Sequence, residues 1–176
     1  MRDLSGGFTP AQLRRYSRHV LLPDVGGRGQ ARLLAATVRV DVSDPAGRVA
    51  AAYLAAAGVG RLVLDGDDRL LEADEVMFPL LAADAGAPLL ATLVARLAGL
   101  NSDSHVSLSR DVPEPSGEGA DRVEGRRSPR GEWALPCDAS LARARAGSGP
   151  AGGLAEAMER GGEMAARIVH AIAVHP

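Results

Sequence analysis

The sequence predicts an α/β fold, a Rossmann-like, mostly parallel sheet flanked by helices. Short runs of β-branched and aliphatic residues alternate with stretches of helical periodicity, as in parallel α/β proteins. The first two of these runs are joined by one short crossover helix, which is the βαβ arrangement of a parallel sheet. Apolar residues make up 46% of the 176 residues, which is enough to bury one core.

Two helices are predicted near the N-terminus. Thr9 followed by Pro10 is typical of a helix start, because the Thr side chain caps an amide of the first turn and Pro fits that turn. The apolar positions of this helix follow helical spacing: Leu13, Tyr16, Val20 and Leu21. Pro23 ends it, and residues 28–35 predict a second, shorter helix after two glycines.

A βαβ unit follows these helices. Residues 38–42 alternate in the manner of a strand, and residues 43–47 predict a turn. The alanine-rich stretch 49–57 predicts a helix closed by Gly58, and residues 62–64 predict the next strand. Four polar or small residues come directly after that strand: Asp65, Gly66, Asp67 and Asp68. They lie where open α/β sheets bind their ligands.

The second half of the chain contains fewer clear elements. A helix is predicted over 89–100, strands over 105–108 and 133–135, and a long helix over 154–174. Residues from about 110 to 131 are rich in Gly, Pro and charge, which predicts a mobile insert. The chain is therefore divided into an N-terminal helical segment over 1–36 and a Rossmann-like domain over 37–176.

Composition and charge exclude several classes of function. The net charge of −2 argues against a nucleic-acid protein that depends on bulk positive charge. All 20 basic residues are Arg, so Schiff-base and P-loop lysines are excluded. A lone Cys137 excludes an internal disulfide and predicts a small core residue, and the four scattered histidines predict no metal site. Without a signal-like or membrane-spanning run, we expect a cytoplasmic protein with no membrane partner.

Two blocks of residues carry a family resemblance. The first contains Arg15-Tyr16-Ser17-Arg18-His19, Leu22-Pro23, Gly26, Gly29-Gln30, Leu33 and Val38; the second contains YLAAAGVGR from Tyr53 to Arg61 and then Leu64-Asp65-Gly66-Asp67. They resemble the ThiF/MoeB/HesA family, the bacterial relatives of ubiquitin-activating enzymes. The match has no gap from about Arg15 to Leu108 and is weak beyond it. We therefore expect a shortened ThiF/MoeB-type fold and a degenerate, truncated member.

The resemblance implies a fold that binds ATP and adenylates the C-terminal glycine of a ubiquitin-like protein, usually as a homodimer. The family's glycine-rich phosphate loop, GxGGxG, corresponds to residues 42–47, where Gly47 alone is kept of the glycines. Pro45 has no N–H to donate, and Asp44 places a carboxylate where the phosphates would lie. Triphosphate binding in the family's manner should therefore be weak.

This sequence retains some of the family's other functional residues and lacks the rest. The family's asparagine and arginine after the second strand fall on Ala73 and Val76, its lysine falls on Leu89, and its zinc-binding CxxC pairs are absent. The family's magnesium-binding aspartate falls near Ala139, where Asp138 fits after a one-residue slip. Two residues are kept: Asp67 matches the ribose-binding acid, and Arg18 matches the arginine that reaches the neighbouring subunit's ATP.

Three hypotheses follow. The first is a catalytically degenerate, non-enzymatic scaffold or regulatory subunit without a cofactor, which acts as a homodimer or with an active homologue. The second is ATP- and Mg-dependent adenylation of a ubiquitin-like or sulfur-carrier protein in a rearranged site. The third is a small-metabolite sensor near Asp44, Asp65 and Asp67.

The candidate site residues also have plain structural interpretations, which stay open at this point. The residual nucleotide site would contain Gly47, Asp65 and Asp67, but the two aspartates equally fit a solvated turn. Arg15 and Arg18 are the candidate in-trans arginines. As exposed helix charges they would instead pair with nearby acids such as Asp24.

Overall fold

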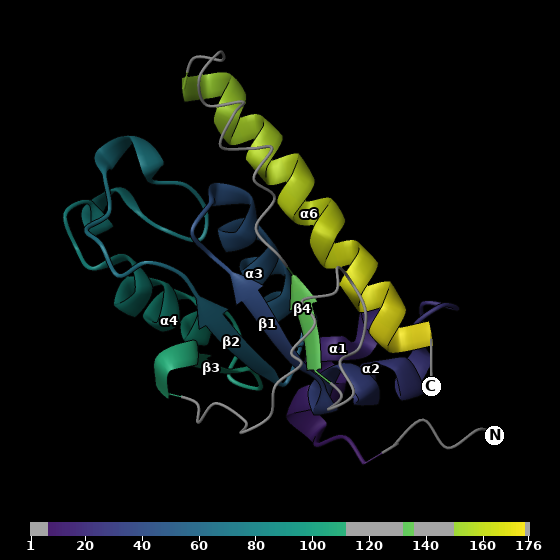
Figure 1. Cartoon of the computed structure of the whole chain (residues 1–176). Coiled ribbons are helices and arrows are strands. Elements are labelled where there is room, and N and C mark those ends of the chain that lie inside the picture. The colour runs from purple at the N-terminus through teal and green to yellow at the C-terminus, as the bar shows by residue number, and fades with distance from the viewer. Residues whose placement is uncertain (1–6, 112–131, 136–149, 175–176) are drawn as a thin grey trace, which may run out of the picture.

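A four-stranded parallel sheet forms the centre of the computed structural model, which describes residues 7–111, 132–135 and 150–174 (Figure 1). The strands are β1 (Thr37–Asp41), β2 (Arg61–Asp65), β3 (His105–Leu108) and β4 (Glu132–Leu135). Their spatial order is β3-β2-β1-β4, and every neighbouring pair is parallel. This arrangement confirms the predicted Rossmann-like α/β fold in a short form.

Helices cover the sheet and its edges. They are α1 (Pro10–Val20), α2 (Gly26–Ala35), α3 (Pro45–Ala57), α4 (Leu89–Leu100) and α6 (Pro150–Val174). Single 3-10 turns are η1 (Ala73–Glu75), η2 (Ala82–Asp84) and η3 (Ser109–Asp111). Within the part of the chain that the structure describes, no helix combines the length and the apolar character needed to cross a bilayer.

One continuous core lies between the sheet and the helices α3, α4 and α6. It joins Val38 and Val40 of β1 to alanines of α3, to Leu93 and Leu97 of α4 and to Ile168 of α6. Because α3 presents alanines rather than larger side chains, α6 lies close to it. A Cβ built on Gly161 of α6 would lie 2.5 Å from the carbonyl oxygen of Ala46. The core contains few large aromatic side chains, and it is filled instead by the close approach of the α3 and α6 backbones.

The predicted helices and strands are present, but two helices begin four residues earlier than predicted. The helix expected over 154–174 begins at Pro150. The helix expected over 49–57 begins four residues earlier, at Pro45, so the turn predicted over 43–47 is largely the first turn of α3. The sequence signal for this start is Asp44 followed by Pro45, an N-cap and a first-turn proline. Arg110 and Asp111 belong to the turn η3, whereas the rest of the insert predicted to residue 131 lies outside the described residues.

The N-terminal helices are fastened to the rest of the fold. The amide of Gly60 donates to the carbonyl of Leu33 over 2.9 Å, where α2 meets the start of β2. The guanidinium of Arg32 donates to the carbonyl of Ala173 at the end of α6 over 2.7 Å. Gly60 has no room for a side chain, because a Cβ would lie 1.8 Å from the carbonyl oxygen of Leu34. The division of the chain at residue 36 stays a prediction.

Gly60→Ala should lower the free energy of unfolding by about 2–3 kcal/mol, because α2 or the start of β2 must move to admit the methyl group. Gly99→Ala is the matched control. It lies in α4 with no atom within 4 Å of the added Cβ, and should raise the free energy of unfolding by about 0.5–1 kcal/mol. Urea denaturation measures both, and a neutral Gly60→Ala would contradict the packing described.

Candidate functional site

The carboxyl ends of β1 and β2 meet at one edge, where Asp41 and Asp65 are register partners. Asp65 is half-buried and accepts a hydrogen bond from the hydroxyl of Ser109 over 3.1 Å. Asp67 is exposed and forms no hydrogen bond with the residues that the structure describes. The candidate residues Asp65 and Asp67 therefore lie at the edge where open α/β sheets bind ligands, and Asp67 is available to one.

The start of α3 is closed by carboxylates of the chain itself. Asp44 is the N-cap, and its Oδ1 accepts from the amide of Gly47 over 2.8 Å. Just before the N-cap, Oδ1 of Asp41 at the end of β1 accepts from the amide of Ser43 over 2.9 Å. Pro45 has no amide hydrogen to offer. The positive end of the helix, which ordinarily attracts an anion, is thus occupied by acidic side chains.

Gly47 is required for geometry. A Cβ at this position would lie 1.9 Å from the carbonyl oxygen of Asp41, so only glycine permits this contact between α3 and β1. The single glycine kept from the phosphate loop therefore preserves the fold of the turn. Nothing in this contact requires a nucleotide.

A buried cation lies behind this turn, and sequence reasoning did not find it. The guanidinium of Arg48 is fully buried and donates to the carbonyls of Val42 and Ser43 over 3.1 and 3.0 Å. It also lies 3.3 Å from a carboxylate oxygen of Glu75, itself 3% exposed. Arg69 donates to the same carboxylate over 2.6 Å, and these hydrogen bonds raise the pKa of Arg69. Glu75 thus forms ion pairs with two arginines beside the edge.

The missed signal was an arginine at the fourth position of an otherwise apolar helix. A buried arginine needs a carboxylate or carbonyl partner, but the sequence does not say which of 22 acidic residues supplies it. Glu75 lies 27 positions away and reaches Arg48 only through the excursion between β2 and α4.

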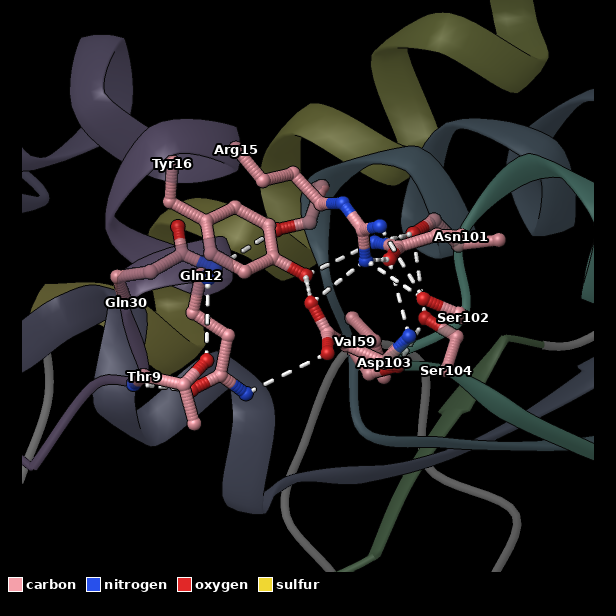
Figure 2. Close-up of polar contacts among 12 residues, drawn as sticks. Thr9, Gln12, Arg15, Tyr16, Gln30, Val59, Asn101, Ser102, Asp103 and Ser104 are labelled. Carbon is pink, nitrogen blue, oxygen red and sulfur yellow. Dashed lines mark hydrogen bonds and ion pairs between the residues drawn. The ribbon is translucent and has the colours of Figure 1, made fainter.

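A second polar network fastens α1 to the body of the protein (Figure 2). Tyr16 is 1% exposed; its hydroxyl accepts from the amide of Asn101 over 2.9 Å and donates to Asp103 over 3.0 Å. Arg15 lies alongside and donates to the same carboxylate of Asp103 over 2.7 Å. Burial is the main cause that raises the pKa of Tyr16, and the carboxylate of Asp103 adds to it. Arg15 and Tyr16 of the family-like motif therefore hold α1 to the body of the protein.

The structure separates the two arginines that were predicted together. Arg15 pairs with Asp103 of its own chain, so the partner suggested from sequence, Asp24, is wrong for Arg15. Its side chain is directed toward the loop before β3 (Figure 2). Arg18, one turn further along α1, is exposed and forms no ion pair with any residue that the structure describes. Of the two candidates, Arg18 is therefore the one without an ion pair to a described residue, and its role in trans stays a prediction.

Several other candidates are settled only in part. Among the described residues, no group of three or more His, Cys, Asp or Glu side chains is arranged to hold a metal ion. Cys137, Asp138 and Ala139 lie outside the described residues. Whether nucleotide binds at Gly47, Asp65 and Asp67 stays a prediction.

Arg15→Ala should lower the free energy of unfolding by about 1 kcal/mol, because Asp103 and Asn101 lose a charged hydrogen-bond donor. Arg18→Ala is the matched control on the same helix and should change stability by less than about 0.5 kcal/mol. Equal effects in urea denaturation would show that the two side chains are not separated as described.

Glu75→Gln should lower the free energy of unfolding by about 3 kcal/mol, since it leaves the guanidinium of Arg48 buried without its carboxylate. Glu72→Gln, three residues earlier and exposed, should be nearly neutral. Thermal or urea unfolding of both variants checks the difference. A stable Glu75→Gln protein would mean that the buried pair contributes little.

Comparison with known proteins shows which proteins this chain resembles. No family model matches the chain. The heterocyst HesA protein of Trichormus variabilis is 40% identical over 108 residues, which are 59% of this chain and 39% of HesA. The SAMP-activating enzyme E1 of Haloferax volcanii is 40% identical over 97 residues, 54% of this chain and 36% of the enzyme. The adenylyltransferase and sulfurtransferase MOCS3 of Bos taurus is 43% identical over 93 residues, 52% of this chain and 20% of MOCS3.

Solved structures agree on the fold. Escherichia coli MccB with succinimide superposes with a TM-score of 0.64 over 90% of this chain and 63% of MccB, at 16% identity. Selenomethionine PaaA superposes with a TM-score of 0.54 over 61% of this chain and 36% of PaaA, at 25% identity. The chain spans about two fifths or less of the curated relatives it matches. With the sheet order, these likenesses show a shortened Rossmann-like fold of the ThiF/MoeB type, in a chain that is similar over part of its length to HesA and the SAMP-activating enzyme E1.

Proposed function

We propose that the chain is a non-enzymatic scaffold or regulatory subunit of its family, one that binds proteins and does not adenylate. The observation that carries this proposal is that the amides of Ser43 and Gly47 are bound by Asp41 and Asp44. A triphosphate in this turn would have to displace both carboxylates and would meet their negative charge at short range. No bound nucleotide or cofactor is therefore expected.

Three positions that the family resemblance assigns to ATP chemistry support the same proposal. Leu89 is 1% exposed in the core, and Val76 packs against that core, so neither is directed at a phosphate. Ala73 lies exposed in η1 with no polar group to offer. By analogy with the removal of an oxyanion-hole donor, each lost electrostatic contact reduces the stabilisation of the transition state by roughly 3 kcal/mol. Two or three such losses together would slow adenylation by roughly 10⁴-fold or more.

A specific observation favours a second candidate, ATP-dependent adenylation in a rearranged site. Two relatives carry activation or adenylyl transfer in their names, the SAMP-activating enzyme E1 and MOCS3. Asp67 and Arg18 are both exposed and available, and Asp67 lies at the ligand-binding edge. On this reading the substrate would be a ubiquitin-like or sulfur-carrier protein, and Mg-ATP would bind despite the acidic turn.

Pyrophosphate–ATP exchange by the purified chain distinguishes the two candidates when a ubiquitin-like or sulfur-carrier protein is added, because the carboxylate of that protein must attack ATP before pyrophosphate is released. We expect no exchange above background, because the inner shell of cations that stabilises the leaving pyrophosphate is missing. Exchange that Asp67→Ala abolishes would reverse the assignment in favour of adenylation.

A double variant, Asp44→Gly with Pro45→Gly, tests whether the turn obstructs nucleotide binding. It removes a carboxylate and restores an amide at the start of α3. Mg-ATP should raise the melting temperature of this variant more than that of the parent chain. If ATP stabilises the parent chain equally well, the turn does not exclude the nucleotide.

A further inference from the structure

We infer that the open edge of β3 accepts an extended segment of a partner protein, which adds to the sheet as a further strand. The inference rests on the proposed role as a protein-binding subunit, and it names the kind of partner segment that this role would use. The backbone of β3 makes the contact, and no nucleotide takes part in it.

Strand β3 ends the sheet on one side, since the order of the strands is β3-β2-β1-β4 and β3 pairs with β2 alone. The amide of His105 donates to the carbonyl of Gly60, just before β2, over 2.8 Å. Backbone groups of successive residues in a strand point to opposite sides, so His105 and Ser107 turn theirs toward β2. Val106 and Leu108 turn their amides toward the open edge.

The outward backbone groups of β3 lack partners within the part of the chain that the structure describes. The amides of Val106 and Leu108 donate to no described residue, and the carbonyl of Val106 accepts from none. Val106 is 9% exposed and Leu108 is 7% exposed, whereas their register partners in β2, Leu62 and Leu64, are 0% and 1% exposed. A backbone amide with so little access to water is best satisfied by a carbonyl, which an added strand supplies.

The sequence of β3 contains none of the residues that usually protect an edge strand. Charged side chains and proline hinder the addition of a further strand, and β3 contains neither Asp, Glu, Lys and Arg nor Pro from His105 to Leu108. The strand at the other edge of the sheet, β4, begins with Glu132, and Pro136 follows it in the sequence. Of the two edges, that of β3 therefore presents fewer obstacles to a partner strand.

The two sides of β3 determine which side chains the added strand needs. Val106 and Leu108 belong to the same core as Leu97 of α4, the helix that packs against β3, whereas the residues that alternate with them are polar. Leu100, one turn beyond Leu97 at the end of α4, is 41% exposed. A segment with apolar residues at every second position would extend this core, and its polar residues would continue the polar side of β3. The occupant is therefore an extended, amphipathic protein segment.

A short synthetic peptide tests whether this edge accepts a strand. The probe is a fluorescein-labelled run of alternating valine and threonine between terminal arginines, and its control has the same composition with the valines and threonines in pairs. By fluorescence anisotropy with the full chain, we expect the alternating peptide to bind with a dissociation constant on the order of 10⁻⁴ M, and the control roughly tenfold more weakly. In hydrogen exchange, the bound probe should slow the amides of Val106 and Leu108 by roughly tenfold.

A proline variant tests the backbone contact itself. Val106→Pro removes an outward amide without removing a hydrogen bond to β2, and proline is tolerated where the nitrogen of an edge strand faces away from the sheet. Val106→Ala is the matched control, because it also loses most of the valine side chain and keeps the amide. We expect the proline variant to bind the alternating peptide roughly tenfold more weakly than the alanine variant.

Three results would each overturn the inference: no binding of the alternating peptide, binding that leaves the amides of Val106 and Leu108 unprotected, or equal affinity of the two Val106 variants. Hydrogen exchange of the parent chain decides the question by itself if the proline variant does not fold. None of these measurements involves ATP, so a chain that exchanges pyrophosphate can still bind the peptide, and an inert chain can fail to bind it. The failure of strand addition is therefore distinguishable from the failure of the proposed function.

Discussion

The tight turn between β1 and α3 is the contact on which the rest of the site depends. Gly47 brings the first turn of α3 so close to the carbonyl of Asp41 that no side chain fits between them. At this distance Asp44 reaches the amide of Gly47, and Arg48 reaches back to the end of β1. The excursion between β2 and α4 then supplies Glu75 to the buried guanidinium. Several features of this edge thus follow from one glycine.

The turn also shows how a fold can keep its geometry while its polar groups change partners. In the resemblance to the ThiF/MoeB/HesA family, the amides at the start of this helix are expected to meet a phosphate. Here Asp41 and Asp44 accept from the amides of Ser43 and Gly47 instead. Because a helix N-terminus favours any nearby negative charge, a side-chain carboxylate satisfies it as a ligand would. Two side chains of the protein therefore supply the negative charge that a bound phosphate would bring.

The same reasoning applies to α1. Arg15 and Arg18 stand three residues apart, yet their surroundings give them different roles. Asp103 and Asn101 hold Arg15 against the body of the protein, whereas Arg18 projects into solvent. A motif that contains both arginines therefore mixes a residue that stabilises the fold with one that is available to a partner. Sequence similarity at such a motif says little about ligand contact.

The sequence by itself determined the order of helices and strands, the parallel sheet and the resemblance to the ThiF/MoeB/HesA family, because each depends on local periodicity, capping residues and contiguous motifs. It also located Asp44, Pro45 and Gly47 at the critical turn. It missed that α3 starts at Pro45, since the apolar pattern that marks a helix becomes clear only from Val49. Only the tertiary structure paired Arg48 with Glu75, paired Arg15 with Asp103 and brought Tyr53 beside Phe78. These partners are 25 to 88 positions apart in the chain, and their meeting depends on how the elements pack, which no local pattern records.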